Sequence, residues 1–384
     1  MAEIKDIKAA RRKRNSKKAI RRLIVLAVAF VIIIGAVILR ESISKENLTA
    51  SVSDFFSSFG SGEGFPLTVP GSRTVQAQSL NSGTAVLTQT QFFVYNKTGK
   101  ELQSSVHGFS NPLMARSGNK TVVYDRGGNG IKVYSKTKQL FSYTFENTIY
   151  GVEMSDKYIA VITASQTHSS EVIVFTNTYK ERMKWYCAEG RVTSIAFDDF
   201  SSEIYAAVVD AENGGYVSSV YKIDVAENEE KGSIKLQGML AMSLKKINGS
   251  VTVIGDERID FLSSDLENMG SYSYGGKALV SLSDKMNETI VLALSDSEND
   301  RGGVIVTLNN KGEESAKIEV SEDITAVDCY KNYIAYLSAS KLNIYNIRTG
   351  KSEFYETDLD AFSVTAGKDG VYTLGVTKIE KQAY

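Results

Sequence analysis

The 384-residue chain has few of the side chains on which most enzyme and metal chemistry depends. It contains two histidines, His107 and His168, two cysteines, three prolines and one tryptophan, Trp185. Each histidine falls in a predicted loop without partners at the spacing of a metal site or of a Ser/His/Asp triad. We therefore interpret both as surface residues and expect neither a histidine-based metal site nor histidine-dependent catalysis.

The motifs that bind nucleotides or calcium are incomplete. Gly127–Gly130 and Gly275–Gly276 lack the Lys-Ser/Thr of a phosphate loop and no helix follows them, so they are interpreted as hairpin glycines. Asp296, Glu298 and Asp300 resemble a calcium loop, but the glycine comes one place late and no glutamate stands at the twelfth position. We interpret them as a solvated acidic turn and expect no metal and no cofactor.

One apolar run stands out near the start of the chain. Leu23 to Leu39 contains no charged or polar side chain and lies between Arg22 and Arg40. A helix rises about 1.5 Å per residue, so these 17 residues, with snorkelling arginines, are just long enough to span a bilayer. The run predicts a single transmembrane helix that contacts membrane lipid.

The charge around this run predicts its orientation. Residues 1–22 carry ten basic and two acidic side chains, a net charge of +8, whereas the whole chain is −1. Basic flanks stay cytoplasmic, so the N-terminus is expected inside and the C-terminal domain outside the plasma membrane. A cleaved signal peptide is the alternative, but the run is long for one and no small-x-small site follows directly. The tail has no aromatic residues on which bases would stack, so no nucleic-acid partner is expected.

Residues 40–71 are rich in serine and glycine. Such a composition buries too little apolar surface to fold alone, so the segment is expected to be a flexible stalk. Within it, residues 65–69 (FPLTV) are interpreted as a short strand that would close a ring with the C-terminal end of the chain.

Residues 72–384 contain a repeated strand-turn-strand element. Aligned copies begin FFVYNKTGK, IKVYSKTKQ and VIVFTNTYK, and one position of the alignment is occupied by Tyr95, Tyr134, Phe175, Tyr221, Leu262, Leu308 and Tyr345. The spacing of about 40 residues is typical of a β-propeller blade, and each copy corresponds to the third strand, a turn and the fourth strand. Innermost strands are predicted to begin near Val75, Pro112, Ile149, Val192, Leu240, Lys277, Ile324 and Ala361. These eight starts predict an all-β, eight-bladed propeller at 72–384, with seven blades as the alternative.

The repeat also places the two cysteines. Cys187 falls on an outer strand of the third repeat and Cys329 on an inner strand of the seventh. Strands so placed lie beyond the reach of a disulfide bond, so two buried free thiols are expected.

The repeats resemble the broad superfamily of WD40-like and quinoprotein-like propellers. The WD dipeptide and the tryptophan-docking motif of quinoprotein dehydrogenases are absent. The whole layout of basic tail, single span, serine-rich stalk and tyrosine-rich propeller resembles a bacterial family of domain-of-unknown-function proteins. The resemblance implies a membrane-anchored propeller and supplies no catalytic residues.

Function is expected in the loops that join the second and third strands. These loops are long in three repeats, at Ala164–Ser170, Asp210–Gly215 and Ser295–Gly302. Because binding residues concentrate on loops held by a rigid scaffold, we expect a partner-binding face near His168, Asp210, Glu212, Asp296, Glu298 and Asp300. Tolerated insertions would give the same pattern. The sequence thus favours a non-enzymatic module for a protein or glycan partner, with a glycan-processing hydrolase or lyase as the alternative.

Overall fold

The structure, a computed structural model, describes residues 26, 28, 45–57, 60–286, 289–296 and 302–384. The chain divides into two compact units, Met1–Leu48 and Thr49–Tyr384, and every described strand belongs to the second. Apart from Leu26 and Val28, the expected span at residues 23–39 lies outside the described residues. Within the part of the chain that is described, none of the helices has both the length and the apolar character needed to cross a bilayer.

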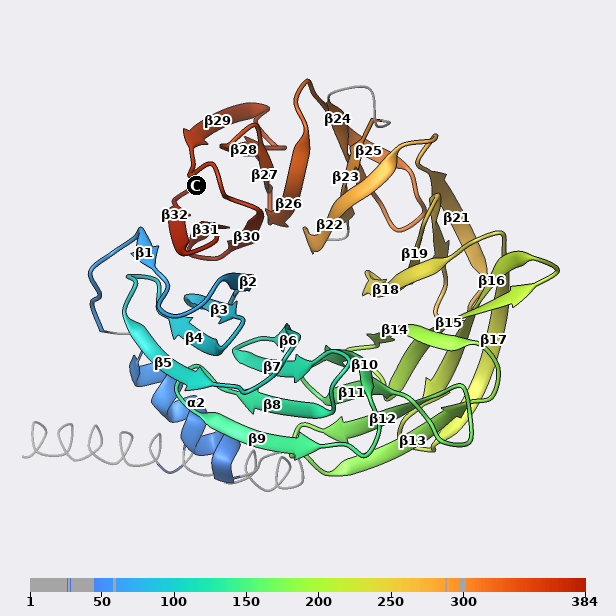
Figure 1. Ribbon diagram of the computed structural model, residues 1–384. Coiled ribbons are helices and arrows are strands. Elements are labelled where there is room, and N and C mark those ends of the chain that lie inside the picture. Colours follow the sequence, from blue (N-terminus) through green and yellow to red (C-terminus); the bar gives the residue numbers. More distant parts are fainter. Residues whose placement is uncertain (1–25, 27, 29–44, 58–59, 287–288, 297–301) are drawn as a thin grey trace, which may run out of the picture. The chain divides into compact units, whose positions relative to one another are not determined.

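The second unit is an eight-bladed β-propeller, which confirms the predicted fold and excludes seven blades. Eight four-stranded antiparallel sheets stand around a central channel (Figure 1). In seven of them the strands follow in sequence order from the channel outwards. The innermost strands begin within two residues of the positions predicted from the repeat.

The first four blades each run from an innermost strand at the channel to an outermost strand at the rim of the ring. In that order they are β2 (Thr74–Ser79), β3 (Thr84–Thr88), β4 (Gln91–Tyr95) and β5 (Glu101–Val106); β6 (Pro112–Ser117), β7 (Lys120–Asp125), β8 (Gly130–Tyr134) and β9 (Gln139–Thr144); β10 (Ile149–Met154), β11 (Tyr158–Thr163), β12 (Ser170–Thr176) and β13 (Glu181–Cys187); β14 (Arg191–Phe197), β15 (Glu203–Glu212), β16 (Gly215–Asp224) and β17 (Glu229–Gln237).

The last four blades follow the same order, and the outermost strand of blade eight comes from the start of the unit. They are β18 (Ala241–Ile247), β19 (Ser250–Gly255), β20 (Arg258–Leu262) and β21 (Asn268–Ser273); β22 (Ala278–Met286), β23 (Thr289–Ser295), β24 (Gly303–Leu308) and β25 (Glu314–Val320); β26 (Ile324–Tyr330), β27 (Tyr333–Ser338), β28 (Lys341–Asn346) and β29 (Lys351–Glu356); β30 (Ser363–Gly367), β31 (Gly370–Leu374), β32 (Lys378–Gln382) and β1 (Leu67–Thr68).

The ring is closed by strands from both ends of the unit. Leu67 pairs with Ile379 and Thr68 with Lys378, so β1 lies within the segment 65–69 that the sequence suggested for this role. The closure removes two free sheet edges, which would otherwise be sites for pairing with another chain.

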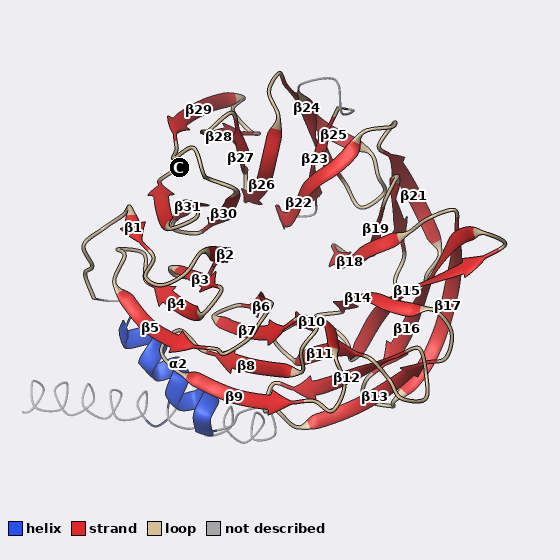
Figure 2. Ribbon diagram, in the orientation of Figure 1, coloured by secondary structure: helices blue, strands red, loops and turns tan. Residues whose placement is uncertain are grey.

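The core consists of apolar clusters between neighbouring blades. Among the described residues there is one cluster at each successive blade–blade contact, including the contact between blade eight and blade one, where Tyr372 and Leu374 pack with Val86 and Phe93. In blade one the second and third strands are almost wholly buried, whereas the outermost strand of blade six alternates between exposed and half-buried residues. Figure 2 shows that strands make up nearly all of the ring. Such alternation follows from the period of two residues by which side chains of a strand face opposite sides.

The expectation of a flexible stalk at 40–71 is wrong for residues 45–57 and 60–64. Helix α2 (Lys45–Ser57) forms instead. Its Asp54 side chain is buried and accepts hydrogen bonds from Thr137 Oγ1 at 2.8 Å and Lys136 N at 3.2 Å, in the turn between β8 and β9. Lys138 Nζ also donates to Thr49 Oγ1 at 2.7 Å. These tertiary contacts supply the stability that the local composition lacks.

The glycine-rich segment after the helix is held against blade one. Gly64 N donates to Thr98 O at 3.0 Å, and Asn96 Nδ2 donates to Gly60 O at 2.7 Å. A Cβ atom at Gly62 would lie 2.2 Å from the backbone nitrogen of Lys100, so the contact requires glycine there. Serine and glycine thus serve close backbone packing here rather than flexibility.

Candidate functional site

The propeller has two faces that differ in their connections. We call the face that carries the connections between first and second and between third and fourth strands the turn face. The opposite face, which carries the connections between second and third strands and between blades, is the loop face. Of the residues predicted for partner binding, His168, Asp210, Glu212 and Asp296 lie on the loop face, in blades three, four and six. Glu298 and Asp300 lie outside the described residues.

The predicted residues do not form one cluster. His168 is exposed and its ring lies 5.0 Å from that of Tyr186. Glu212 Oε1 pairs with Lys235 Nζ at 2.6 Å, and Asp296 pairs with Lys277. Because lysines already balance two of the carboxylates, these positions favour a surface that contacts a partner over a cation site. Among the described residues, no group of three or more potential metal ligands occurs.

The connection expected as a long loop in blade four is a β-hairpin. Asp210 pairs with Val217 and Glu212 with Gly215, so both acids lie on β15. The tip is Asn213-Gly214, with φ of 53° and 80°. An Asn-Gly pair with two positive φ angles is the turn that a tight hairpin requires, and it extends the strands beyond the rest of the face.

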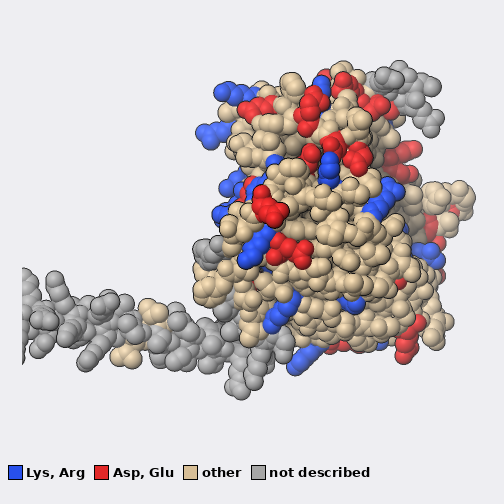
Figure 3. Space-filling view, turned by 60° about the vertical axis from the view of Figure 1, so that its left-hand side comes forward, with Lys and Arg blue, Asp and Glu red and all other residues tan. Residues whose placement is uncertain are grey.

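Exposed apolar side chains are frequent on the loop face. They stand at strand ends or in connections between blades, where packing within the ring does not require them. They are Val106, Tyr186, Tyr216, Met242 and Leu359. In Figure 3 acidic and basic side chains are interspersed over the visible flank of the ring.

The central channel contains a charged cavity of about 710 Å³. Innermost strands of five blades contribute its six charged side chains, which are three bases and three acids. They are Arg116, Glu153, Lys245, Asp284, Lys285 and Asp328. None of the site residues predicted from the sequence is among them.

Asp328 connects three blades. Its buried carboxylate accepts hydrogen bonds from Ala366 N at 2.8 Å and from Ser283 Oγ, and it pairs with Lys285. Lys285 Nζ also donates to Thr365 Oγ1 at 3.2 Å. A buried carboxylate is tolerated only when it is paired in this way, so Asp328 ties blades six, seven and eight together at the channel.

Glu153 and Lys245 compensate each other in the channel. Burial raises the pKa of Glu153, Lys245 opposes this rise, and Asp284 adds to it. The carboxylate of Glu153 in turn raises the pKa of Lys245 above its usual range, against the effect of burial. A carboxyl group with a raised pKa beside a second carboxylate is an electrostatic arrangement that acid–base chemistry uses.

At the turn face the channel opens into a second cavity of about 440 Å³. Arg116 and Lys285 line both cavities, so the two adjoin. Lys368 lines the mouth cavity on the connection between β30 and β31, and no Asp or Glu among the described residues lines it. The mouth is therefore more positive than the channel below it.

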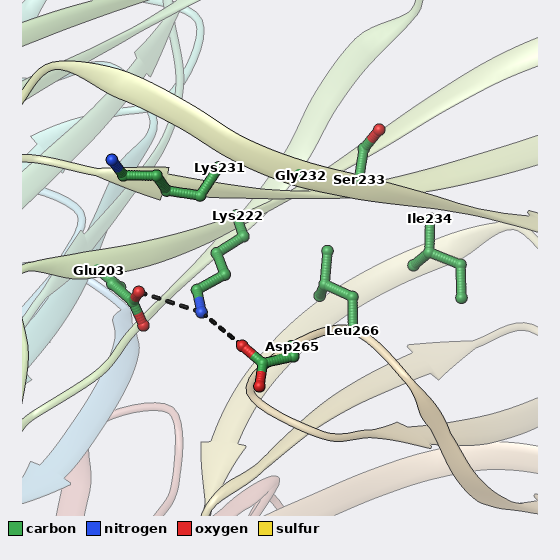
Figure 4. Close-up of a pocket in the computed structure, with 8 residues that line it drawn as sticks. All are labelled: Glu203, Lys222, Lys231, Gly232, Ser233, Ile234, Asp265 and Leu266. Atoms are coloured by element: carbon green, nitrogen blue, oxygen red, sulfur yellow. Dashed lines mark hydrogen bonds and ion pairs between the residues drawn. The ribbon is translucent and has the colours of Figure 1, made fainter.

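A third cavity, of about 570 Å³, lies between blades four and five (Figure 4). Lys222 Nζ there pairs with Glu203 and Asp265, each at 3.0 Å. Burial lowers the pKa of Lys222, but the hydrogen bonds to both carboxylates outweigh it and the pKa lies above its ordinary value. Since this lysine is already fully paired, we interpret the cavity as a contact between blades.

The interpretation of His107 as a surface residue is wrong. The side chain is 2% exposed. Its Nε2 lies 3.1 Å from Thr88 O, and its Nδ1 accepts a hydrogen bond from Phe109 N at 3.0 Å. The ring is therefore neutral and fills a gap in blade one, with burial lowering its pKa.

The channel charges correspond to a pattern in the sequence that is not one of the familiar motifs. An innermost strand is expected to be apolar or to carry small polar residues, yet several have a charged residue four places after the strand start. The pairs are Pro112 and Arg116, Ile149 and Glu153, Ala241 and Lys245, and Ile324 and Asp328. Charges at one repeat position of the innermost strand indicate a charged channel.

The eight four-stranded sheets define the chain as a β-propeller protein. The chain belongs to a family of unknown function, DUF5711, whose profile matches residues 68–381. No curated protein matches the sequence.

Solved propellers share the fold at low sequence identity. The computationally designed protein Ika8 is 15% identical, with a TM-score of 0.64 over 83% of this chain and 98% of its own. BamB from Moraxella catarrhalis is 13% identical, with a TM-score of 0.55 over the same shares of the two chains. Sqt1 from Saccharomyces cerevisiae is 11% identical, with a TM-score of 0.61 over 85% of this chain and all of its own. These likenesses concern the fold alone.

Proposed function

We propose that the protein is a single-pass membrane-anchored propeller that displays its ring outside the plasma membrane and binds a protein or glycan partner. It would act as a scaffold, an envelope-complex subunit or a receptor. The apolar run at 23–39 and the basic tail before it support the anchor and its orientation. The scaffold, similar to those of WD40 proteins and BamB, supports a binding role.

The observation that carries the proposal is the docking of Asp54 on the turn between β8 and β9. It fixes the point where the chain joins the ring to the turn face of blade two. Because helix α2 docks on the turn face, the loop face on the opposite side of the ring is the surface that we propose for the partner.

The loop face has the composition expected of a binding surface. Aromatic residues are enriched at the centre of interfaces, and Tyr186 and Tyr216 are exposed there on neighbouring blades. His168 packs on Tyr186, so the residue selected from the sequence belongs to the same exposed group.

Site-specific photocrosslinking in intact membranes tests this proposal. A photoreactive residue at Tyr186 or Tyr216 is expected to capture one defined partner, identified by mass spectrometry. Matched probes at the exposed Lys311 and Lys157 on the turn face are expected not to capture it. Capture from the turn-face positions alone would contradict the assignment of the loop face.

A hydrolase acting on glycans is the second candidate, and the channel supplies the observation that favours it. Glu153, whose pKa burial raises, and Asp284 line one cavity. Hydrolysis of glycosides requires one protonated and one ionised carboxyl group facing the same sugar. If the protein cleaves envelope glycans, E153Q and D284N will each abolish cleavage and D265N, on the exposed turn of blade five, will not. Lack of cleavage by the unaltered protein would eliminate this candidate.

A further inference from the structure

We propose that the turn-face mouth of the central channel binds a small anionic molecule through a phosphate or carboxylate group. This site is separate from the loop face, and the proposal does not depend on membrane anchoring.

The mouth is a cavity built by several blades. Its volume of about 440 Å³ is within the range of small-molecule sites. Blades one, two, six, seven and eight contribute to it, so side chains distant in the sequence converge on one space. Its polar lining includes Ser79, Asn81, Arg116, Lys285, Tyr330 and Lys368.

The cations that line the mouth differ in whether their donors are used. Lys285 is paired with Asp328. The side chains of Arg116 and Lys368, in contrast, make no hydrogen bond or ion pair with any residue in the described part of the chain. The nearest acid in sequence, Asp369, accepts a hydrogen bond from Gly83 N at 2.9 Å and does not line the cavity. Two positive charges therefore remain available to a ligand.

Arg116 is the more informative of the two cations. It projects from β6 at the boundary of both cavities and is half-buried, and burial lowers its pKa while Asp328 and Asp284 oppose this effect. A half-buried guanidinium group without a bonded partner has lost part of its hydration, and no acceptor among the described residues replaces it. Phosphate and carboxylate groups match its planar fork of donors, so an anion is the ligand that offsets this loss best.

An unpaired acceptor lies along the adjoining cavity. Gln78 Oε1 is buried and has no hydrogen-bond partner among the described residues, while its Nε2 donates to Met114 O at 3.3 Å. The bond to Met114 fixes the amide orientation, so Oε1 would accept a hydrogen bond from a ligand.

Calorimetric titration of the full-length protein in detergent micelles at low salt tests the proposal, with citrate and inorganic pyrophosphate as separate probes. If citrate binds, the site recognises carboxylate groups. If pyrophosphate binds, the site recognises phosphate groups. R116Q is expected to weaken binding by about tenfold or more, which corresponds to about 1.4 kcal/mol. K368Q is expected to weaken it by about threefold or more.

Matched controls make the result specific to the mouth. R348Q and K311Q remove the same types of charge from exposed turns of blades seven and six, and are expected to change affinity by less than about twofold. If circular dichroism shows that R116Q does not fold, the affinity of K368Q tests the proposal instead. Lys368 lies on an exposed connection, so its substitution is expected to leave the fold intact. The proposal is overturned if neither probe binds at about 10 mM, or if K368Q and folded R116Q bind as tightly as the unaltered protein.

Discussion

The carboxylate of Asp328 on the innermost strand of blade seven accepts a hydrogen bond from the backbone nitrogen of Ala366 on blade eight, at 2.8 Å. The same carboxylate pairs with Lys285 of blade six. One side chain therefore connects three blades beside the point where the ring closes.

Removal of the Asp328 carboxylate is expected to destabilise the ring. D328A leaves Lys285 and the amide of Ala366 without their partner in a buried site, which costs about 3 kcal/mol in the free energy of unfolding. Denaturant unfolding measures the difference. D265A, which removes a carboxylate that is 83% exposed, is the control and is expected to cost less than about 1 kcal/mol. Equal losses in the two variants would contradict the role of Asp328.

Asp54 is expected to hold helix α2 on the ring. D54A removes the acceptor for Thr137 Oγ1 and Lys136 N, so the helix loses its docking contact at a cost of about 1–3 kcal/mol. Hydrogen exchange of the amides in 45–57 is expected to become faster, while exchange in the strands stays unchanged. S53A changes an exposed residue of the same helix and is the control. Unchanged protection of the helix in D54A would refute the contact.

The buried His107 is expected to make stability depend on pH. Burial lowers its pKa in the folded protein, so the unfolded chain binds the proton more tightly. The stabilising contribution is therefore complete above the unfolded pKa of about 6.5 and is lost as the pH falls through the lower folded pKa. Denaturation midpoints measured between about pH 7 and 5 should fall, and H107Q should remove this part of the decrease. H168Q changes the exposed histidine and is the control, for which the same dependence of the denaturation midpoint on pH is expected. If the midpoint of H107Q falls with pH as much as that of the unaltered protein, His107 is not the source of the pH dependence.

The two cysteines are expected to be unreactive in the folded protein. Both are free and buried, as predicted, and burial raises the pKa of Cys329 to about 12. At about pH 8 the thiolate fraction of Cys329 is then near one in ten thousand, and burial also raises the pKa of Cys187. A chromogenic disulfide reagent should release no colour from the native protein and two equivalents after unfolding. Rapid reaction of the native protein would show that one thiol is accessible.

The fold was predictable because copies of one strand-turn-strand element recur in the sequence about every 40 residues. The aligned positions from Tyr95 to Tyr345 lie on third strands, and glycine-containing turns at 96–99, 309–312 and 347–350 follow three of those strands. Alternating burial has a period of two residues, which a single sequence reveals directly. The eighth blade was predictable only because 65–69 offered the missing strand.

Contacts between distant segments were not predictable in the same way. The helical state of 45–57 depends on a turn more than 80 residues away, which Asp54 contacts. His107 is buried by its bonds to Thr88 and Phe109, although its local sequence is typical of a loop. The channel site needs strands from five blades to converge, so Arg116 and Lys368 are brought together only by the closed ring. Tertiary context, rather than local propensity, decides each of these positions.

Labelling of single cysteines in intact cells tests the central claim most directly. Cys187 and Cys329 are buried, so a cysteine introduced at Tyr216 on the loop face or at Lys13 in the basic tail will dominate the signal from a membrane-impermeant maleimide. An anchored, outward-facing propeller predicts that Y216C is labelled in intact cells and that K13C is labelled only after permeabilisation. Labelling of Y216C that also requires permeabilisation would contradict the account.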